Sequence, residues 1–403
     1  MRRLDRAAPG GRPGREFTAG TRAQGARQLA ASVPVRTAAS GAQIAIPILA
    51  VATTGDIALG AMLVALALMP GIVAAPLVGA LLDRSHRPRA WMMGAAAGTA
   101  AAYAVAAALD PLPVWLVASA LVVSGLLNPF GFGGLSSFLS TADDGDHHRA
   151  YALDALSYNL SGVAGPALVA VLAPTVGPRW ALVAMAAIAL CSVAAYPLLH
   201  VEPRETERTG LWRSMAAGIV ALSTHRRLAV VTTSGTLAEL GRGILPIAAI
   251  GIAVATLGDP AASAIVVTAF AIGALLGAAI EPIRRRSLSP QATMLIGFGL
   301  TGLATLAAAL DLGLVWTVAL VGISGLCTAA PTAAMLMLRR TESPEGVVAQ
   351  VFTVGAALRT AASAAGTAIA GALAGLDPLL LLAGSGLVWL LSGATMLAFP
   401  RRG

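Results

Sequence analysis

The chain has 403 residues, of which 57% are hydrophobic and 11% are charged, and its mean hydropathy is +0.79. Soluble domains carry about 25% charged residues, so this composition excludes an ordinary water-soluble domain, and its apolar content excludes a disordered chain. All 27 basic residues are arginine, and against 19 acidic residues they leave a net charge of +8. What this charge contacts depends on where the arginines lie relative to the apolar segments.

Apolar runs of roughly 20 residues, the length that a helix needs to cross a bilayer, recur along the chain. They are dominated by Ala, Leu and Gly and lack the alternation of a strand. Because backbone groups in lipid must pair within the segment, each run predicts a helix. Twelve spans are expected, at residues 31–53, 57–82, 90–108, 113–138, 150–173, 178–199, 228–257, 261–283, 290–310, 313–338, 347–373 and 378–399. The predicted fold is an all-α membrane protein of twelve transmembrane helices.

The segments between these spans fall into two alternating sets. One set contains nearly all the arginines, including those of the N-terminal tail, of residues 84–89 and of residues 200–227. The other set consists of short turns, each marked by an aspartate: Asp56, Asp110, Asp259, Asp311 and Asp377. Because basic loops stay on the cytoplasmic side, both termini are predicted to be cytoplasmic, in a multi-pass protein of the cell membrane. The arginines are then expected to meet anionic lipid and not nucleic acid.

Residues 200–227 form the longest polar stretch between spans and divide the chain into two predicted bundles, 29–199 and 228–403. This stretch is expected to be a cytoplasmic linker, and residues 1–28, which lack an apolar signal segment, a disordered cytoplasmic tail. The two bundles are related, because matching features recur about 200 residues apart. The register pairs Pro47 with Pro246, Gln43 with Arg242, and Asn159 with Arg359. It indicates an internal duplication of six helices, an arrangement common among transporters.

The loop between the second and third spans carries a motif, Gly79-Ala-Leu-Leu-Asp83-Arg84-Ser-His-Arg87-Pro-Arg89. Its glycine, its Asp-Arg pair and the arginines after them resemble the loop signature of the major facilitator superfamily, and the similarity runs from about Leu29 to Phe399. His86 and Pro88 depart from that signature. The resemblance implies a transporter without a cofactor, with a gating latch at Gly79, Asp83, Arg84, Arg87 and, in the second copy of the motif, Glu281.

The fifth span carries a second motif, Gly162-Val-Ala-Gly165-Pro166. It resembles the signature of drug-exporting antiporters, although Val169 and Ala170 stand where that signature continues with glycines. The resemblance implies export. The residue-level alternative is that the glycines and the proline serve helix packing and bending alone.

Charged groups at bilayer depth are costly and usually functional. Glu239 lies 11 residues into the seventh span, roughly 16 Å from its start at 1.5 Å per residue, and Arg242 follows on the same face. Arg359 and Asn159 lie at similar depths in spans eleven and five, and Gln43 belongs to span one. These five residues are the predicted substrate and proton pathway, and a structural ion pair is the alternative. Asp154, one turn inside span five, joins them as a gate or as a helix N-terminal charge.

The cluster of acidic and histidine residues at 143–148 supports a rival interpretation. It could hold a metal ion, as in a membrane-embedded enzyme that acts on a lipid-linked substrate. No nucleotide-binding loop or hydrolase motif is present. The preferred hypothesis is a monomeric transporter that exports a small organic molecule by alternating access, coupled to protons. The charges of Glu239, Arg242 and Arg359 sum to +1, which favours an acid-bearing substrate. A metabolite importer of the same fold is the third alternative.

Overall fold

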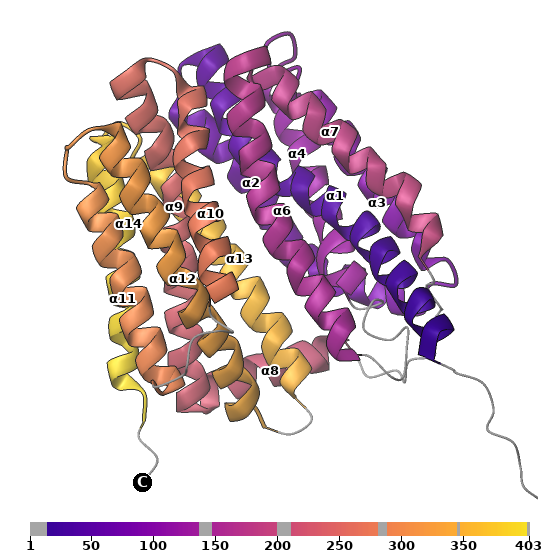
Figure 1. Ribbon diagram of the computed structural model, residues 1–403. Coiled ribbons are helices and arrows are strands. Elements are labelled where there is room, and N and C mark those ends of the chain that lie inside the picture. The colour runs from indigo at the N-terminus through magenta and orange to yellow at the C-terminus, as the bar shows by residue number, and fades with distance from the viewer. Residues whose placement is uncertain (1–13, 137–146, 200–210, 281–287, 345–346, 401–403) are drawn as a thin grey trace, which may run out of the picture.

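The computed structural model describes residues 14–136, 147–199, 211–280, 288–344 and 347–400, and within these ranges the chain is helical with no strands (Figure 1). Ten helical segments there are long and apolar enough to cross a membrane. The predicted third and eleventh spans also form helices, α3 (Pro88–Ala106) and α13 (Val348–Ala372), but these fall outside that set, since both are rich in Ala and carry Thr and Arg. The all-α class is confirmed, and the count of twelve spans stays a prediction.

The two halves of the chain repeat one arrangement. The first comprises α1 (Gly14–Thr54), α2 (Ile57–Arg84), α3, α4 (Val114–Pro129) with the π-helical turn η1 (Phe130–Gly134), α6 (His147–Val176) and α7 (Pro178–Ala195). The second comprises α9 (Arg226–Leu257), α10 (Ser263–Ile280), α11 (Pro290–Ala308), α12 (Leu314–Glu342), α13 and α14 (Pro378–Thr395). In the first half α1 packs on α6 and α7, and α4 packs on α2 and α3; α9 and α12 have the corresponding neighbours in the second half. This agreement supports the duplication inferred from the sequence.

Some aspartates of the short turns cap the helices that follow them. Asp56 accepts a hydrogen bond from the Leu59 backbone N–H at 3.1 Å, and Asp377 accepts one from Leu379 at 2.8 Å. A side-chain acceptor at this position satisfies a donor that the first helical turn leaves unpaired. Gly258, at φ 67°, ends α9 in the left-handed conformation that favours glycine. We call this side of the molecule the Asp end, and the opposite side, where α1 begins and η4 (Met396–Ala398) lies, the Arg end (Figure 1).

Two segments expected to be irregular are partly helical. The predicted disordered tail covers residues 1–28, but α1 already begins at Gly14, so the span continues as helix beyond the apolar run. Ala, Arg, Gln and Glu, which favour helix, make up much of this extension. Within the predicted linker 200–227, residues 211–224 form α8 (Leu211–Thr224). Its Leu222 is buried and packs with Leu228 of α9 and Val351 of α13.

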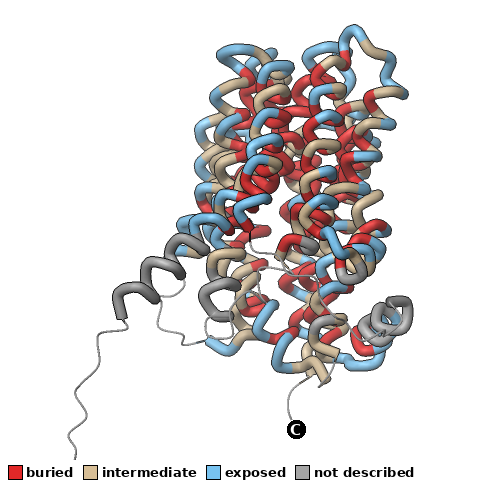
Figure 2. The backbone as a smooth tube through the Cα atoms, turned by 90° about the vertical axis from the view of Figure 1, so that its right-hand side faces the viewer, coloured by how far each residue is buried: buried red, intermediate tan, exposed pale blue. Residues whose placement is uncertain are grey.

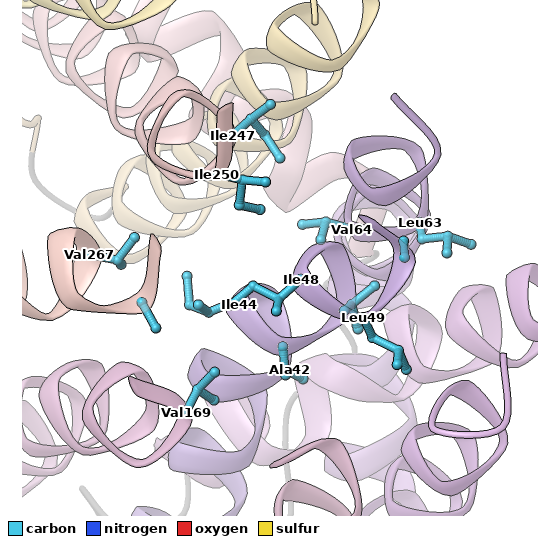
Figure 3. Packing of buried hydrophobic residues seen from close by; sticks show 14 of the residues in the cluster. Ala42, Ile44, Ile48, Leu49, Leu63, Val64, Val169, Ile247, Ile250 and Val267 are labelled. Atoms are coloured by element: carbon cyan, nitrogen blue, oxygen red, sulfur yellow. The ribbon is translucent and has the colours of Figure 1, made fainter. Parts of the chain in front are cut away.

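The hydrophobic core joins the two halves only toward the Asp end. One cluster of buried side chains, the shared core, contains residues of α1, α2, α9 and α10, and Figure 3 shows Ile48, Val64, Ile250 and Val267 within it. Toward the Arg end the first half has its own cluster, and the second half has two others. Figure 2 likewise shows buried backbone concentrated along the middle and the Asp end of the bundle.

Close contacts between helices of different halves follow the same gradient. A Cβ atom added at Gly371 of α13 would lie 2.2 Å from the Ala61 Cβ of α2, near the Asp end. Toward the Arg end of α2, no atom lies within 4 Å of a Cβ added at Gly79. Helices α2 and α13 therefore touch at the Asp end and leave Gly79 uncovered. The two halves therefore pack against each other at the Asp end, and their buried clusters are separate toward the Arg end.

Candidate functional site

A buried carboxylate bridges two arginines near the middle of the second half. The Arg242 Nε donates to Glu239 Oε2 at 2.5 Å, and the Arg359 Nε donates to Glu239 Oε1 at 3.1 Å, with a second ion-pair contact from Arg359 Nη2. Glu239 and Arg242 lie on α9, and Arg359 lies on α13. The sequence predicted Glu239 and Arg242 as a pair, and the structure adds Arg359 to the same carboxylate. We call these three residues the central triad.

The members of the triad differ in exposure. The Glu239 side chain is 10% exposed, whereas that of Arg242 is 49% exposed. Helix α9 contacts α10, α12, α13 and α14 in its own half and α1 and α2 in the other. Between Leu228 and Ala253 its only exposed residues are Thr233 and Arg242. The exposed guanidinium therefore reaches the space between the halves, and the carboxylate is enclosed behind it.

Small residues hold α9 and α13 close enough for the triad to form. A Cβ added at Gly243 would lie 2.0 Å from the Ser363 carbonyl oxygen, and one added at Gly366 would lie 2.1 Å from the Leu240 carbonyl oxygen. The Thr367 hydroxyl also donates to the Gly243 carbonyl oxygen at 2.9 Å. Close backbone approach through glycine, reinforced by a hydrogen bond between helices, is a common way of packing helices in membranes. Gly165 plays the equivalent role between α6 and α1, which supports the packing interpretation of this glycine.

Sequence reasoning missed a second buried ion pair. Arg36 of α1 is fully buried and donates through Nη1 to Asp154 Oδ1 of α6 at 2.8 Å. Its Nη2 donates to the Ser136 hydroxyl at 2.8 Å, and its guanidinium carbon lies 3.7 Å from the centre of the Tyr158 ring. Arg36 therefore does not extend to the membrane surface, because its partners come from two other helical segments. The sequence did contain a signal for this pair. Arg36 lies in the apolar run of span one, and Asp154 lies at a similar depth in span five.

The other predicted site residues do not join the triad. Gln43 is partly buried on α1, and Asp154 is held by Arg36 in the first half. The Asn159 side chain lies outside the described residues, as do the side chains of Asp83 and Arg84 and the whole of Glu281. Arg87 is exposed at the start of α3. The latch therefore stays a prediction.

The rival metal site falls on residues that the structure does not describe. Residues 143–146 and the side chains of His147 and His148 lie outside the described part. Among the residues that are described, no group of three or more His, Cys, Asp or Glu side chains could hold a metal ion.

Two six-helix halves with ionised side chains at mid-depth define a multi-pass membrane transporter. A profile of the Major Facilitator Superfamily matches residues 29–238, which is just over half of the chain. The protein therefore belongs to the Major Facilitator Superfamily, and it is a secondary transporter of small molecules and not an enzyme.

Individual proteins agree with this assignment. The chain is 26% identical over 323 residues to the uncharacterized MFS-type transporter y4rN of Sinorhizobium fredii (strain NBRC 101917 / NGR234), covering 76% of this chain and 77% of that protein. Among solved structures, the nucleoside transporter NupG superposes with a TM-score of 0.76 at 13% identity, covering 94% of this chain and 100% of NupG. A peptide transporter, POT, superposes with a TM-score of 0.69 at 13% identity, covering 93% of each chain. At this identity the two structures bear on the fold alone.

Proposed function

We propose that this secondary transporter couples the movement of a small organic molecule to protons, with Glu239 as the coupling acid. The observation that supports this most is the central triad, in which one carboxylate near the middle of α9 holds two arginines from two helices. Charged groups at this depth are retained at considerable cost. A carboxylate that can exchange partners is the group that proton coupling requires.

The coupling follows from the cost of an unpaired charge. While Arg242 and Arg359 contact Glu239, the carboxylate is stable as an anion. When substrate or a helix movement draws the arginines away, the isolated carboxylate is costly, and it takes up a proton. Return of the arginines expels that proton. Because Arg242 faces the space between the halves, it is the member that substrate reaches first.

Two directions of transport are compatible with this chemistry. Export by exchange, the direction that the sequence favours, requires substrate and proton to compete for the site. Uptake by cotransport requires them to bind together. Uptake is supported by a specific feature, since neutralising Glu239 frees both guanidinium groups for a ligand. In either direction alternating access would open the Asp end as the Arg end closes.

Transport by purified protein in lipid vesicles tests the coupling role. A panel of small organic molecules is offered under an imposed pH gradient, and transport is followed for the wild type and for Glu239→Gln. The variant should lose transport driven by the pH gradient, yet it should retain exchange of substrate at equal concentrations on the two sides. Glutamine preserves the size of the side chain and removes the group that titrates.

A second acid serves as the matched control. Glu342, at the end of α12, ion-pairs with Arg227 at 3.3 Å near the Arg end and away from the triad. Glu342→Gln makes the same chemical change and should leave pH-driven transport intact. Normal pH-driven transport by Glu239→Gln would move the coupling role elsewhere, with Asp154 as the next candidate.

A further inference from the structure

A third arginine is buried beside the central triad. Arg339 of α12 is 1% exposed, and its Nε and Nη2 have no hydrogen-bond partner among the described residues. Two glycines make room for its guanidinium. A Cβ added at Gly355 of α13 would lie 2.7 Å from Arg339 Nη1, and a Cβ added at Gly235 of α9 would lie 3.6 Å from Nη2. The guanidinium therefore lies between α9 and α13.

The helical register places this guanidinium one helical turn from the triad, toward the Arg end. Gly235 precedes Glu239 by four residues, and Gly355 precedes Arg359 by four residues. Residues four apart lie on one face of a helix, about 5–6 Å from each other. Arg339 therefore occupies the next turn toward the Arg end between the same two helices, and Glu239 and Arg359 are its charged neighbours.

Charge is not balanced in this group of four residues. One carboxylate faces three guanidinium groups, so two positive charges are in excess. Asp154, the described acid inside a span of the first half, is already paired with Arg36. A buried charge without a partner is costly, because it has lost its hydration and gained no opposite charge. A ligand that brings negative charge would remove this cost.

Arg242 is placed to receive such a ligand. Only its Nε is engaged, by Glu239, and its Nη1 and Nη2 have no hydrogen-bond partner among the described residues. Two adjacent N–H groups of a guanidinium match the two oxygens of a carboxylate or phosphate. Its side chain is half exposed to the space between the halves. The Nη1 and Nη2 groups of Arg242 are therefore suited to bind a negatively charged group.

We propose that the substrate is an organic anion, bearing a carboxylate, phosphate or similar group, and that it travels in the same direction as the proton. This inference rests on the proposed coupling role of Glu239. Protonation of Glu239 releases Arg242 and Arg359 and leaves three guanidinium groups for the anion. Proton and anion therefore strengthen each other's binding, and reciprocal binding of this kind gives cotransport. A cationic substrate would instead compete with the proton for Glu239 and give exchange.

Probes with permanent charge test the preference without titrating themselves. Benzenesulfonate and trimethylphenylammonium have comparable size and opposite charge. Inorganic phosphate is a smaller anion, without an organic part that must fit the shape of the pocket. Ligand-induced shifts of the melting temperature are measured on the full-length protein in detergent. Benzenesulfonate and phosphate should stabilise the protein, and trimethylphenylammonium should not. The effect of benzenesulfonate, whose charge does not change with pH, should be stronger at lower pH. Stabilisation by the cation alone, or by none of the three, overturns the proposal.

Variants assign the effect to the site. Arg242→Gln should weaken benzenesulfonate binding by about tenfold to a hundredfold, as expected for loss of a charge-assisted pair. Arg242→Lys should recover part of that loss, because it keeps the charge but not the paired donors. Arg179→Gln, at an exposed arginine at the start of α7 and outside every predicted site, is the matched control and should bind as the wild type does. Equal loss in Arg179→Gln and Arg242→Gln would mean that the anions bind to arginines non-specifically.

The direction of coupling has its own measurement. An inward gradient of benzenesulfonate should acidify the lumen of vesicles that contain the wild-type protein, whereas exchange would make the lumen more alkaline. In Glu239→Gln the acidification should disappear while anion-induced stabilisation persists. If anions bind but Glu239→Gln still acidifies the lumen, the coupling role of Glu239 fails and the substrate class stands. If the wild-type lumen becomes alkaline, cotransport is wrong.

Discussion

Two arginine side chains are almost completely buried in the described part of the chain, and they are partnered differently. Arg36 has an aspartate, hydroxyl groups, carbonyl oxygens and an aromatic ring around it. Arg339 has two nitrogens without a hydrogen-bond partner, although Glu239 lies one helical turn away. A fully satisfied arginine fixes the helices that it joins, whereas one that lacks partners has capacity for another ligand. We therefore assign Arg36 a structural role and Arg339 a part in the binding site.

The structural role of Arg36 can be measured with a double-mutant cycle. Arg36→Met leaves Asp154 without its partner, and Asp154→Asn leaves a buried guanidinium uncompensated, so each should cost about 3–5 kcal/mol of stability. The double variant Arg36→Met with Asp154→Asn should cost less than the sum of the two single changes, because neither charge remains. Melting temperatures in detergent give the comparison. Additive effects of the two changes would show that the residues do not act as a pair.

The sequence predicts how deep the charged residues lie within their spans, but it does not predict all of their partners. Hydropathy placed Glu239, Arg242 and Arg359 near the middle of their spans, and the structure brings these three together. It could not pair Arg36 with Asp154, because depth along a helix says nothing about which face of that helix meets which neighbour. Arg339 lies just past residue 338, where the sequence predicts the tenth span to end, whereas α12 continues four residues further, as far as Glu342.

At the scale of helices, the triad depends on how closely α9 and α13 approach. Gly243 and Gly366 allow the two backbones to touch, and the glycines of α1 and α6 do the same in the first half. A helix with several glycines forgoes intrinsic stability, about 1 kcal/mol for each relative to alanine. The close approach compensates by bringing Arg359 within hydrogen-bonding distance of Glu239. Small residues at this contact therefore position the charged ones.

Substituting Gly243 tests this dependence. In Gly243→Ala the new methyl group would lie 2.0 Å from the Ser363 carbonyl oxygen, so α13 must move away. Overpacking of this kind costs about 1–3 kcal/mol, and the movement should also weaken the ion pair between the helices. Both a lower melting temperature and reduced substrate affinity are expected. Gly162→Ala is the matched control, because no atom lies within 4 Å of the added Cβ, and it should be neutral or stabilising. Equal effects at the two glycines would reject close packing as the cause.

At the scale of the whole molecule, the sequence predicts topology but not conformation. Apolar runs predicted the order of the long helices, and matching positions in the two halves indicated the repeat. Which end is closed depends on packing between halves, such as that of Ile48 with Ile250 in the shared core (Figure 3). Every apolar face in such a protein meets either a helix or lipid, and composition does not distinguish the two. The sequence therefore does not predict at which end the two halves close.

The orientation in the membrane is a separate prediction. Arginine is concentrated at the Arg end, so this end should face the cytoplasm. Reporter fusions placed after Asp110 and Asp259, which both mark turns at the Asp end, should read as external. A fusion within residues 211–224 should read as cytoplasmic. A cytoplasmic signal at either aspartate would require a different number of spans.

Closure of the Asp end should be reversible if alternating access operates. In a background of Cys191→Ser and Cys327→Ser, the pair Ala61→Cys and Gly371→Cys places two thiols where α2 and α13 touch. The two Cβ positions lie 2.2 Å apart, so the helices must separate by about 1.5 Å to reach the roughly 3.5–4.5 Å of a disulfide. Oxidation should link them and stop transport, because the Asp end could no longer open, and reduction should restore the rate. Substrate should still bind from the Arg end of the linked protein, which separates a locked transporter from an unfolded one. Each single cysteine variant is the control and should be insensitive to oxidation. Full transport by the linked protein would mean that α2 and α13 need not separate there, and the closed Asp end would then not be one of two alternating gates.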